Sequence, residues 1–178
     1  DEGVPVETEM KSYVLLLVED NETMLEFMSE RLREVFTVET ATNGQEALEV
    51  LRNRRIDLVI SDIMMPVMNG WELCKEIKSD MDLSHIPVIF LTAKNDIDSK
   101  INGLKIGAEA YVEKPFSFNY LKTQIVSLLY NRQKEREAFS KRPFFPTNKM
   151  QMNKVDEEFM NKVIRTIEEN IIDTNLNV

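Results

Sequence analysis

Polar side chains follow four of the five short apolar runs in the 178-residue sequence. They are Glu19 and Asp20 after the first run, Asp62 after the third, Thr92 after the fourth and Lys114 after the fifth. Open α/β sheets bind their ligands outside the carboxyl ends of the strands. If these runs form one parallel sheet, the five side chains therefore share one rim.

This set of side chains suits phosphoryl chemistry with a hard metal ion. Carboxylates crowded at one rim repel one another unless a cation lies between them, and oxygen-only ligands favour Mg²⁺. A lysine and a hydroxyl complete a site for phosphoryl oxygens, and a carboxylate can itself be the nucleophile. The sequence holds neither a Walker A loop nor a GxGxxG motif, so it predicts no nucleotide cradle.

The order of apolar segments predicts the elements that position this rim. Strands are expected at 13–18, 36–40, 58–61, 88–91 and 110–112, and three of these runs are continuous, which is typical of strands buried on both faces. Helical stripes are expected at 25–35, 47–51, 73–77, 97–104 and 121–129. Right-handed crossovers then give an α/β doubly wound parallel sheet with helices on both faces.

Four motifs lie at the ends of predicted strands: VLLLVEDN (14–21), SDIMMPVMNG (61–70), LTAK (91–94) and YVEKPF (111–116). Each alone has low specificity, but all four in this order are highly specific. Through them the sequence resembles the receiver domain of two-component response regulators over residues 13–132. The resemblance implies a flavodoxin-like (β/α)5 fold with strand order 2-1-3-4-5, followed here by a C-terminal helical extension.

The resemblance also implies the roles of the acidic residues. Asp62 is the expected phosphoacceptor. Glu19 and Asp20 are expected to hold Mg²⁺ together with Asp62 and the backbone carbonyl of Met64.

The remaining rim residues are expected to form the catalytic and switching part of the site. Thr92 and Lys114 bind the phosphoryl oxygens in receivers, and the Lys114–Pro115 bond is expected to be cis. The new charge on Asp62 draws the Thr92 hydroxyl inward, and Tyr111 rotates into the vacated space. The surface of the fourth helix, fifth strand and fifth helix then changes shape, and this surface typically pairs two receivers into a dimer.

Two positions depart from the best-studied receivers in ways that affect how long the phosphorylated state lasts. Met64 lies two residues after Asp62, and Lys94 lies two residues after Thr92. Side chains there are placed to cover the acyl phosphate and to hinder attacking water. We therefore expect slow self-dephosphorylation, suited to transcription rather than to rapid motility. Glu19 replaces an Asp and leaves the charge intact.

Each rim residue taken alone has a structural explanation. An Asp after a strand is more often a helix cap, a Thr in a strand is ordinary and most lysines lie on the surface. The joint presence of Asp20, Asp62, Thr92 and Lys114 argues against capping. For Tyr111, a plain core role stays open beside the switch role.

Three further residues and one basic stretch receive structural interpretations. His85 is expected in a surface loop rather than as a phosphorylated histidine, Cys74 as a buried apolar side chain, and Trp71 as partly buried near the third helix. The basic stretch 132–142 is expected to be a solvated helix end, with a DNA contact as the lesser alternative.

Composition restricts the compartment and the partners. A formal net charge of −9 argues against nucleic-acid binding by the whole chain. A single cysteine allows no internal disulfide and fits a reducing compartment. The sequence has no apolar run long enough to span a membrane and no signal peptide. We expect this segment to be cytoplasmic and to make no contact with a membrane. Its longer parent protein can still be anchored in one.

Domain organisation is expected as a linker at 1–12, a receiver at 13–135, a linker at 136–154 and a further helix at 155–178. The last segment resembles the first helix of an AraC-type DNA-binding domain, or else is an extra helix that docks or dimerises. The helix-turn-helix pairs would lie beyond Val178, so specific DNA binding is not expected here. The lead of twelve residues and the missing Met favour a piece of a hybrid histidine kinase and response regulator.

The leading functional hypothesis is a phosphoacceptor switch that takes a phosphoryl group from a histidine kinase, in the same chain or in a separate one, and controls transcription. It is not an enzyme beyond self-catalysed phosphotransfer to Asp62. One alternative is a degenerate receiver that only binds partners. The other is an aspartyl-phosphate hydrolase, which needs a second Asp where this sequence has Met64.

Overall fold

The computed structural model describes residues 10–93 and 105–140. In chain order the elements are β1 (Val14–Val18), α2 (Glu22–Arg33), β2 (Thr37–Ala41), α3 (Gly44–Asn53), β3 (Leu58–Asp62), α4 (Gly70–Ser79), β4 (Val88–Ala93), β5 (Ala110–Lys114) and α6 (Phe118–Ser140). Contacts divide the chain into two units, 1–136 and 137–178, and the elements above belong to the first apart from the last residues of α6. None of the described helices is both long and apolar enough to cross a membrane.

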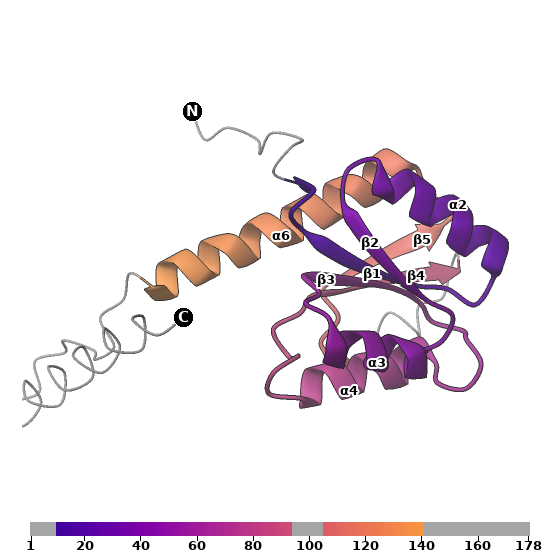
Figure 1. Ribbon diagram of the computed structural model, residues 1–178, viewed down its shortest axis with the longest axis horizontal. Coiled ribbons are helices and arrows are strands. Elements are labelled where there is room, and N and C mark those ends of the chain that lie inside the picture. The colour runs from indigo at the N-terminus through magenta and orange to yellow at the C-terminus, as the bar shows by residue number, and fades with distance from the viewer. Residues whose placement is uncertain (1–9, 94–104, 141–178) are drawn as a thin grey trace, which may run out of the picture. The chain divides into compact units, whose positions relative to one another are not determined.

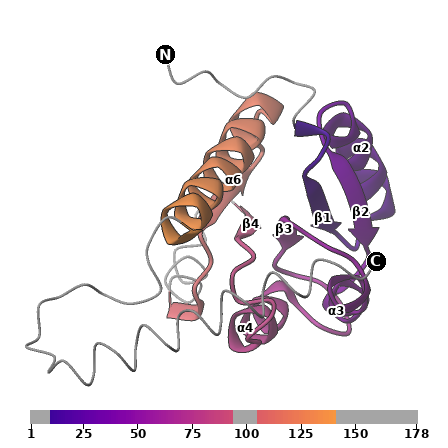
Figure 2. The ribbon, with the colours of Figure 1, turned by 60° about the vertical axis from the view of Figure 1, so that its left-hand side comes forward.

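The five strands form one parallel sheet in the order β2-β1-β3-β4-β5. Helices α2 and α6 cover one face of the sheet, and α3 and α4 cover the other (Figure 1; Figure 2 shows the same layers after a turn). The predicted fold class and strand order are therefore confirmed. The strands β3, β4 and β5 run one or two residues further than the predicted apolar runs, and Asp62, Thr92 and Lys114 are the last or next-to-last residues of these strands, as expected.

Apolar side chains on the two faces of the sheet build two separate cores. Leu15, Leu17 and Ile60 pack toward α2 and α6. Leu16, Val18 and Val59 point the other way, into the core that contains Leu73 of α4. The central strand β1 is thus buried on both faces, because alternate side chains of a strand point to opposite sides. This burial fixes the strand ends that carry the polar residues.

Several predicted features lie outside the described residues. They are the helix at 97–104, Lys94, residues 1–9 of the first linker, residues 141–154 of the second, and the helix at 155–178.

Candidate functional site

The carboxyl ends of β1, β3 and β5 bring a lysine between two carboxylates. Lys114 Nζ lies 3.0 Å from Glu19 Oε2 and 3.1 Å from Asp62 Oδ2. The Glu19 side chain is only 3% exposed and that of Asp62 18%. Because the site is partly screened from water, these contacts are stronger than the same pairs would be on an open surface.

Asp20 completes an acidic cluster with Glu19 and Asp62. One carboxylate oxygen of each lies within 4.8 Å of the others. Glu19 is buried, Asp62 is half-buried and Asp20 is exposed, so the cluster opens to solvent on the Asp20 side. Three oxygen donors at this spacing, with one open side, match what a hard divalent cation needs when it keeps several waters.

Charge balance in the site depends on Lys114. Burial raises the pKa of the Glu19 carboxyl above its ordinary value, although the hydrogen bond from Lys114 works against this rise. Burial would lower the pKa of Lys114, but the hydrogen bond to Glu19 and the nearby charge of Asp62 outweigh it, and the pKa is raised. Lys114 is thus a firmly held cation between two carboxylates of the site.

Neither aspartate of the cluster caps a helix. The N-caps of α2 and α4 are Asn21 and Asn69, whose side chains accept from the backbone N–H groups of Met24 and Glu72. Asp62 accepts instead from the N–H of Ile63, at 2.7 Å. The capping explanation that each aspartate has alone is therefore excluded at both strand ends.

The loop between Asp62 and α4 is held close to the acidic cluster. The N–H of Gly70 donates to Ile63 O at 2.9 Å, and a Cβ at Gly70 would lie 2.3 Å from Asp62 O. Only glycine fits this approach of backbone to backbone. Val67 has a φ of 69°, and Met68 N–H donates to Pro66 O across it, so this exposed β-branched residue occupies a strained turn.

Thr92, near the end of β4, and Tyr111, near the start of β5, each carry a buried hydroxyl. Thr92 Oγ1 and the Tyr111 hydroxyl have no hydrogen-bond partner among the described residues. Burial raises the pKa of Tyr111 to about 12. The Phe90 ring lies 5.8 Å from that of Tyr111 and 4.6 Å from that of Trp71, so a chain of aromatic rings joins β5 to the start of α4. An unpartnered buried hydroxyl is unusual and marks a place where a ligand group is expected.

The other predictions about single residues have plain outcomes. The Lys114–Pro115 bond is cis, as predicted. Cys74 is fully buried and His85 is exposed in its loop, both as predicted. Trp71 is partly buried at the start of α4. The Met64 side chain is 78% exposed beside Asp62.

Two carboxylates at the opposite end of the sheet were not predicted from the sequence. Asp57 precedes β3 and accepts from Val14 N–H, and Glu109 precedes β5 and accepts from Val88 N–H. Each thus binds the first residue of a neighbouring strand. The sequence signal is an acidic residue immediately before a buried strand, where an unpaired charge would be costly.

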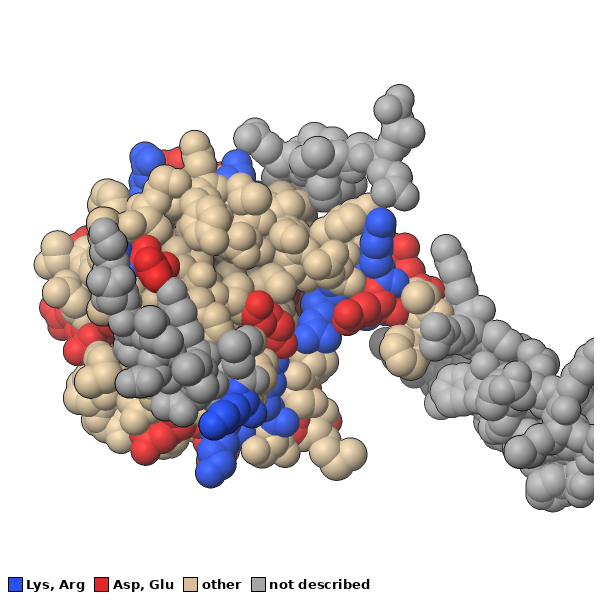
Figure 3. All heavy atoms as spheres, turned by 180° about the vertical axis from the view of Figure 1, so that it is seen from behind, with Lys and Arg blue, Asp and Glu red and all other residues tan. Residues whose placement is uncertain are grey.

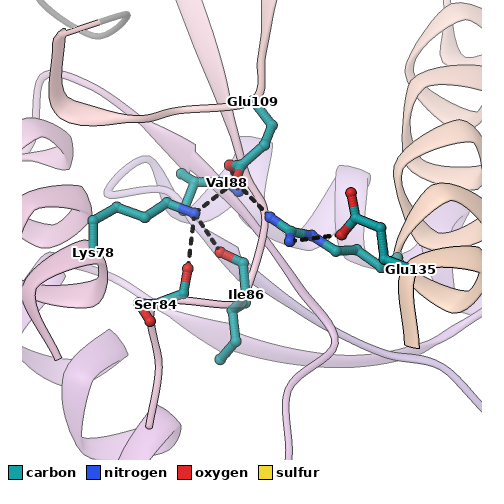
Figure 4. Close-up of polar contacts among 7 residues, drawn as sticks. Lys78, Ser84, Ile86, Val88, Glu109 and Glu135 are labelled. Carbon is teal, nitrogen blue, oxygen red and sulfur yellow. Dashed lines mark hydrogen bonds and ion pairs between the residues drawn. The ribbon is translucent and has the colours of Figure 1, made fainter. Parts of the chain in front are cut away.

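Glu109 also collects two cations, as Figure 4 shows for Lys78. Lys78 Nζ lies 2.7 Å from Glu109 Oε1 and donates to Ile86 O at 2.8 Å. Arg132 of α6 reaches the same Glu109 oxygen at 3.0 Å and pairs with Glu135 at 3.1 Å. This network ties α4, β4, β5 and α6 together at the end of the sheet away from the acidic cluster.

A protein-family model described as the response regulator receiver domain matches residues 15–126. Among curated proteins, the chain is 32% identical over 171 residues to Histidine kinase P4 of Formosa agariphila, covering 96% of this chain and 12% of that protein. It is 41% identical over 120 residues to the probable transcriptional regulator ycf27 of Cyanidium caldarium, covering 67% of this chain and 47% of that protein. The chain thus spans less than half the length of these relatives.

Among solved structures, the chain resembles the signal receiver domain of a signal transduction histidine kinase from Syntrophus aciditrophicus. The TM-score is 0.63 at 32% identity, and the match covers 76% of this chain and 98% of that one.

Proposed function

The chain belongs to the response regulator receiver domain family of two-component systems, and from that premise we propose that Asp62 accepts a phosphoryl group from a histidine kinase. The observation that carries the proposal is the position of Lys114 Nζ between the carboxylates of Glu19 and Asp62. A lysine held in this way beside a half-buried carboxylate is poised to neutralise charge that develops on transferred phosphoryl oxygens.

In the proposed reaction a carboxylate oxygen of Asp62 attacks phosphorus. The new bond is an acyl phosphate O–P bond, and the P–N bond of the donor phosphohistidine breaks, so that the imidazole leaves and takes up a proton. Asp62 Oδ1 is held by Ile63 N–H and Oδ2 by Lys114. These contacts orient the carboxylate for attack.

Glu19, Asp20 and Asp62, with the backbone carbonyl of Met64, are the proposed Mg²⁺ ligands. The carboxylates fit the ion because their oxygens lie within 4.8 Å of one another and the Asp20 side is open to water. A bound Mg²⁺ supplies positive charge against the phosphoryl oxygens during transfer. Glu19 fits this role because burial raises its pKa, and a cation nearby offsets that penalty.

Thr92 and Tyr111 are the proposed switch residues. The buried Thr92 hydroxyl, which lacks a partner among the described residues, is available to donate to a phosphoryl oxygen on Asp62. Tyr111 lies on the adjacent strand and contacts Phe90. We expect phosphorylation to alter the packing of this pair and so the surface around β5, which is the proposed surface for pairing with a second copy.

The parent protein is proposed to be a hybrid histidine kinase with an AraC-type DNA-binding region, which relays the signal to transcription. Similarity to Histidine kinase P4 spans 96% of this chain and therefore continues beyond the receiver. DNA binding is assigned to the region after this chain. The face drawn in Figure 3 carries both acidic and basic side chains, whereas a DNA-binding face is predominantly basic.

A degenerate receiver that only binds partners is the second candidate, and a hydrolase is the third. The acidic cluster with its lysine favours the acceptor over the binding module. Met64 offers no general acid for hydrolysis of an aspartyl phosphate.

One experiment separates the three. The chain is incubated with Mg²⁺ and acetyl phosphate, and its intact mass is measured. A gain of one phosphoryl group that is absent in Asp62→Asn, and retained in the control Asp82→Asn, supports the acceptor. The absence of any adduct supports the binding module, and continuous turnover of a stable phosphoester supports the hydrolase.

A further inference from the structure

A cavity with several charged side chains in its lining lies at the end of the sheet opposite the acidic cluster. It has a volume of about 240 Å³ and is bounded by residues that precede β1, β3 and β4 and by the later turns of α6. Its lining includes Tyr13, Arg55, Asp57 and Arg132. Nothing in the proposed phosphoacceptor reaction uses these residues, and they come from segments far apart in the sequence.

Cationic side chains dominate the charge of this lining. Arg55, Arg132 and Arg136 border the cavity together with His85, and Asp57 is the one carboxylate among the lining residues. The chain as a whole carries a formal charge of −9. Three arginines around one small cavity are therefore a local exception, and they repel one another unless anionic groups lie near them.

Two of the arginines are already held in place by carboxylates. Arg55 Nη2 lies 3.1 Å from Asp57 Oδ1, and the Asp57 side chain is only 4% exposed. Arg132 uses Nη2 for Glu109 and Nη1 for Glu135. A guanidinium carries five N–H donors, so both keep donors free of these pairs. Because these ion pairs already restrict the two arginine side chains, less conformational entropy is lost when they bind a ligand.

The carboxylates near the cavity do not fully neutralise the positive charge of its arginines. Glu109 shares its charge between Arg132 and Lys78, as Figure 4 shows for Lys78. Asp57 is divided between Arg55 and the N–H of Val14. Arg136 adds a further exposed guanidinium at the cavity. The cavity therefore presents preorganised, incompletely neutralised N–H donors.

We propose that this cavity binds a small anion of the phosphate or diphosphate class. Planar guanidinium groups bind phosphate oxygens in pairs of parallel hydrogen bonds, which suits a tetrahedral anion better than a single carboxylate. The volume lies below the roughly 300–1,000 Å³ of sites for drug-sized ligands, so one or two phosphate groups fit and a whole nucleotide does not.

The test uses inorganic diphosphate and the full chain, without Mg²⁺ so that the acidic cluster cannot hold the anion through a metal. Binding is followed by the amide shifts in ¹H–¹⁵N NMR spectra. We expect saturable shifts at Tyr13, Val14 and the 129–136 turns of α6, and none at Glu19 or Asp62. Failure of this test leaves the phosphoacceptor proposal untouched, since that proposal is tested by mass.

Arg136→Gln is the informative variant, because Arg136 is exposed and its loss leaves no buried carboxylate unpaired. It should weaken diphosphate binding by roughly tenfold. The matched control is Arg52→Gln, which removes the same charge from an exposed position of α3 and should change the affinity less than about twofold. Equal losses in both variants, or no saturable shifts with the wild-type chain, would overturn the proposal.

Discussion

Lys114 Nζ and Glu19 Oε2, 95 residues apart in the sequence, lie 3.0 Å apart at the rim of the sheet. The same ammonium lies 3.1 Å from Asp62 Oδ2. The positive charge of Lys114 therefore lies against two of the three carboxylates that are proposed to bind Mg²⁺. Since like charges disfavour one another in a partly buried site, lysine and metal ion compete for these oxygens even though both assist transfer.

Lys114→Ala should consequently bind Mg²⁺ more tightly and yet accept phosphate more slowly. Removing the ammonium should raise the Mg²⁺ affinity by roughly tenfold, which corresponds to about 1.4 kcal/mol. Isothermal titration calorimetry measures the affinity, and mass spectrometry measures the rate of phosphorylation by acetyl phosphate. Lys75→Ala, an exposed lysine of α4, is the control and should change neither. An unchanged or weaker Mg²⁺ affinity in Lys114→Ala would contradict the competition.

Gly70→Ala should destabilise the fold and impair phosphoryl acceptance together. The added Cβ would lie 2.3 Å from Asp62 O and 3.0 Å from Ile63 Cα, and a backbone neighbour cannot rotate away. We expect the free energy of unfolding in urea to fall by about 2–3 kcal/mol. The Asp62 backbone must shift to relieve the contact, so the yield of phosphorylated protein should fall as well.

Gly107→Ala is the control for this prediction. Gly107 has a φ of 100°, and among the described residues the nearest atom to a Cβ there is Lys78 Cγ at 3.6 Å. The backbone strain should cost about 1 kcal/mol, while the phosphorylation yield stays at the wild-type level. A Gly70→Ala protein with wild-type stability would show that the loop after Asp62 is not tightly held.

The acidic cluster could be predicted from the sequence because strand ends are local features. The buried run before Glu19 ends where the polar residues begin, and the same holds before Asp62. The pairing of Lys114 with Glu19 was not predicted, because it depends on the positions of β1 and β5 on either side of β3 and β4. The spacing of residues within one motif does not give the distance between two strands of the folded sheet.

The opposite end of the sheet was missed for the same reason. Asp57 binds Val14 N–H from 43 residues away, and Glu109 joins Lys78 and Arg132 across three elements. The extent of α6 agrees with the solvated helix end that was expected for the basic stretch 132–142, because the described part of that stretch, up to Ser140, is helical and mostly exposed. Its apolar stripe ends near Leu129, but good helix formers such as Gln133, Lys134 and Glu135 carry the helix on to Ser140.

Cys74 should make stability depend on pH above neutrality. Burial raises the pKa of its thiol to about 11 from the ordinary 9.0. A raised pKa favours the neutral thiol in the folded state, so its contribution is complete below pH 9 and is lost as the pH rises through 11. The loss should approach about 3 kcal/mol, since each pKa unit is worth about 1.4 kcal/mol.

The measurement compares the unfolding free energy of the wild type and Cys74→Ala from pH 7 to pH 11. Other titrating groups are common to both proteins, so the difference isolates the thiol. Wild type should be the more stable by a constant margin up to about pH 8, and the margin should shrink between pH 9 and pH 11. Parallel curves across the whole range would exclude a buried, neutral thiol.

Phosphorylated Asp62 should lose its phosphoryl group slowly, and Met64 should be one reason. The Met64 side chain is 78% exposed and lies two residues beyond Asp62, where it can fold over an acyl phosphate and exclude water. Met64→Asn replaces this apolar cover with an amide that can orient an attacking water. We expect hydrolysis several times faster than in the wild type, whose phosphoryl group should persist for many minutes with Mg²⁺ present.

Met81→Asn is the control, because the Met81 side chain is 95% exposed on the loop after α4. Its acyl phosphate should hydrolyse at the wild-type rate. Loss within seconds from the wild-type chain, or identical decay of Met64→Asn, would show that water reaches the acyl phosphate unhindered.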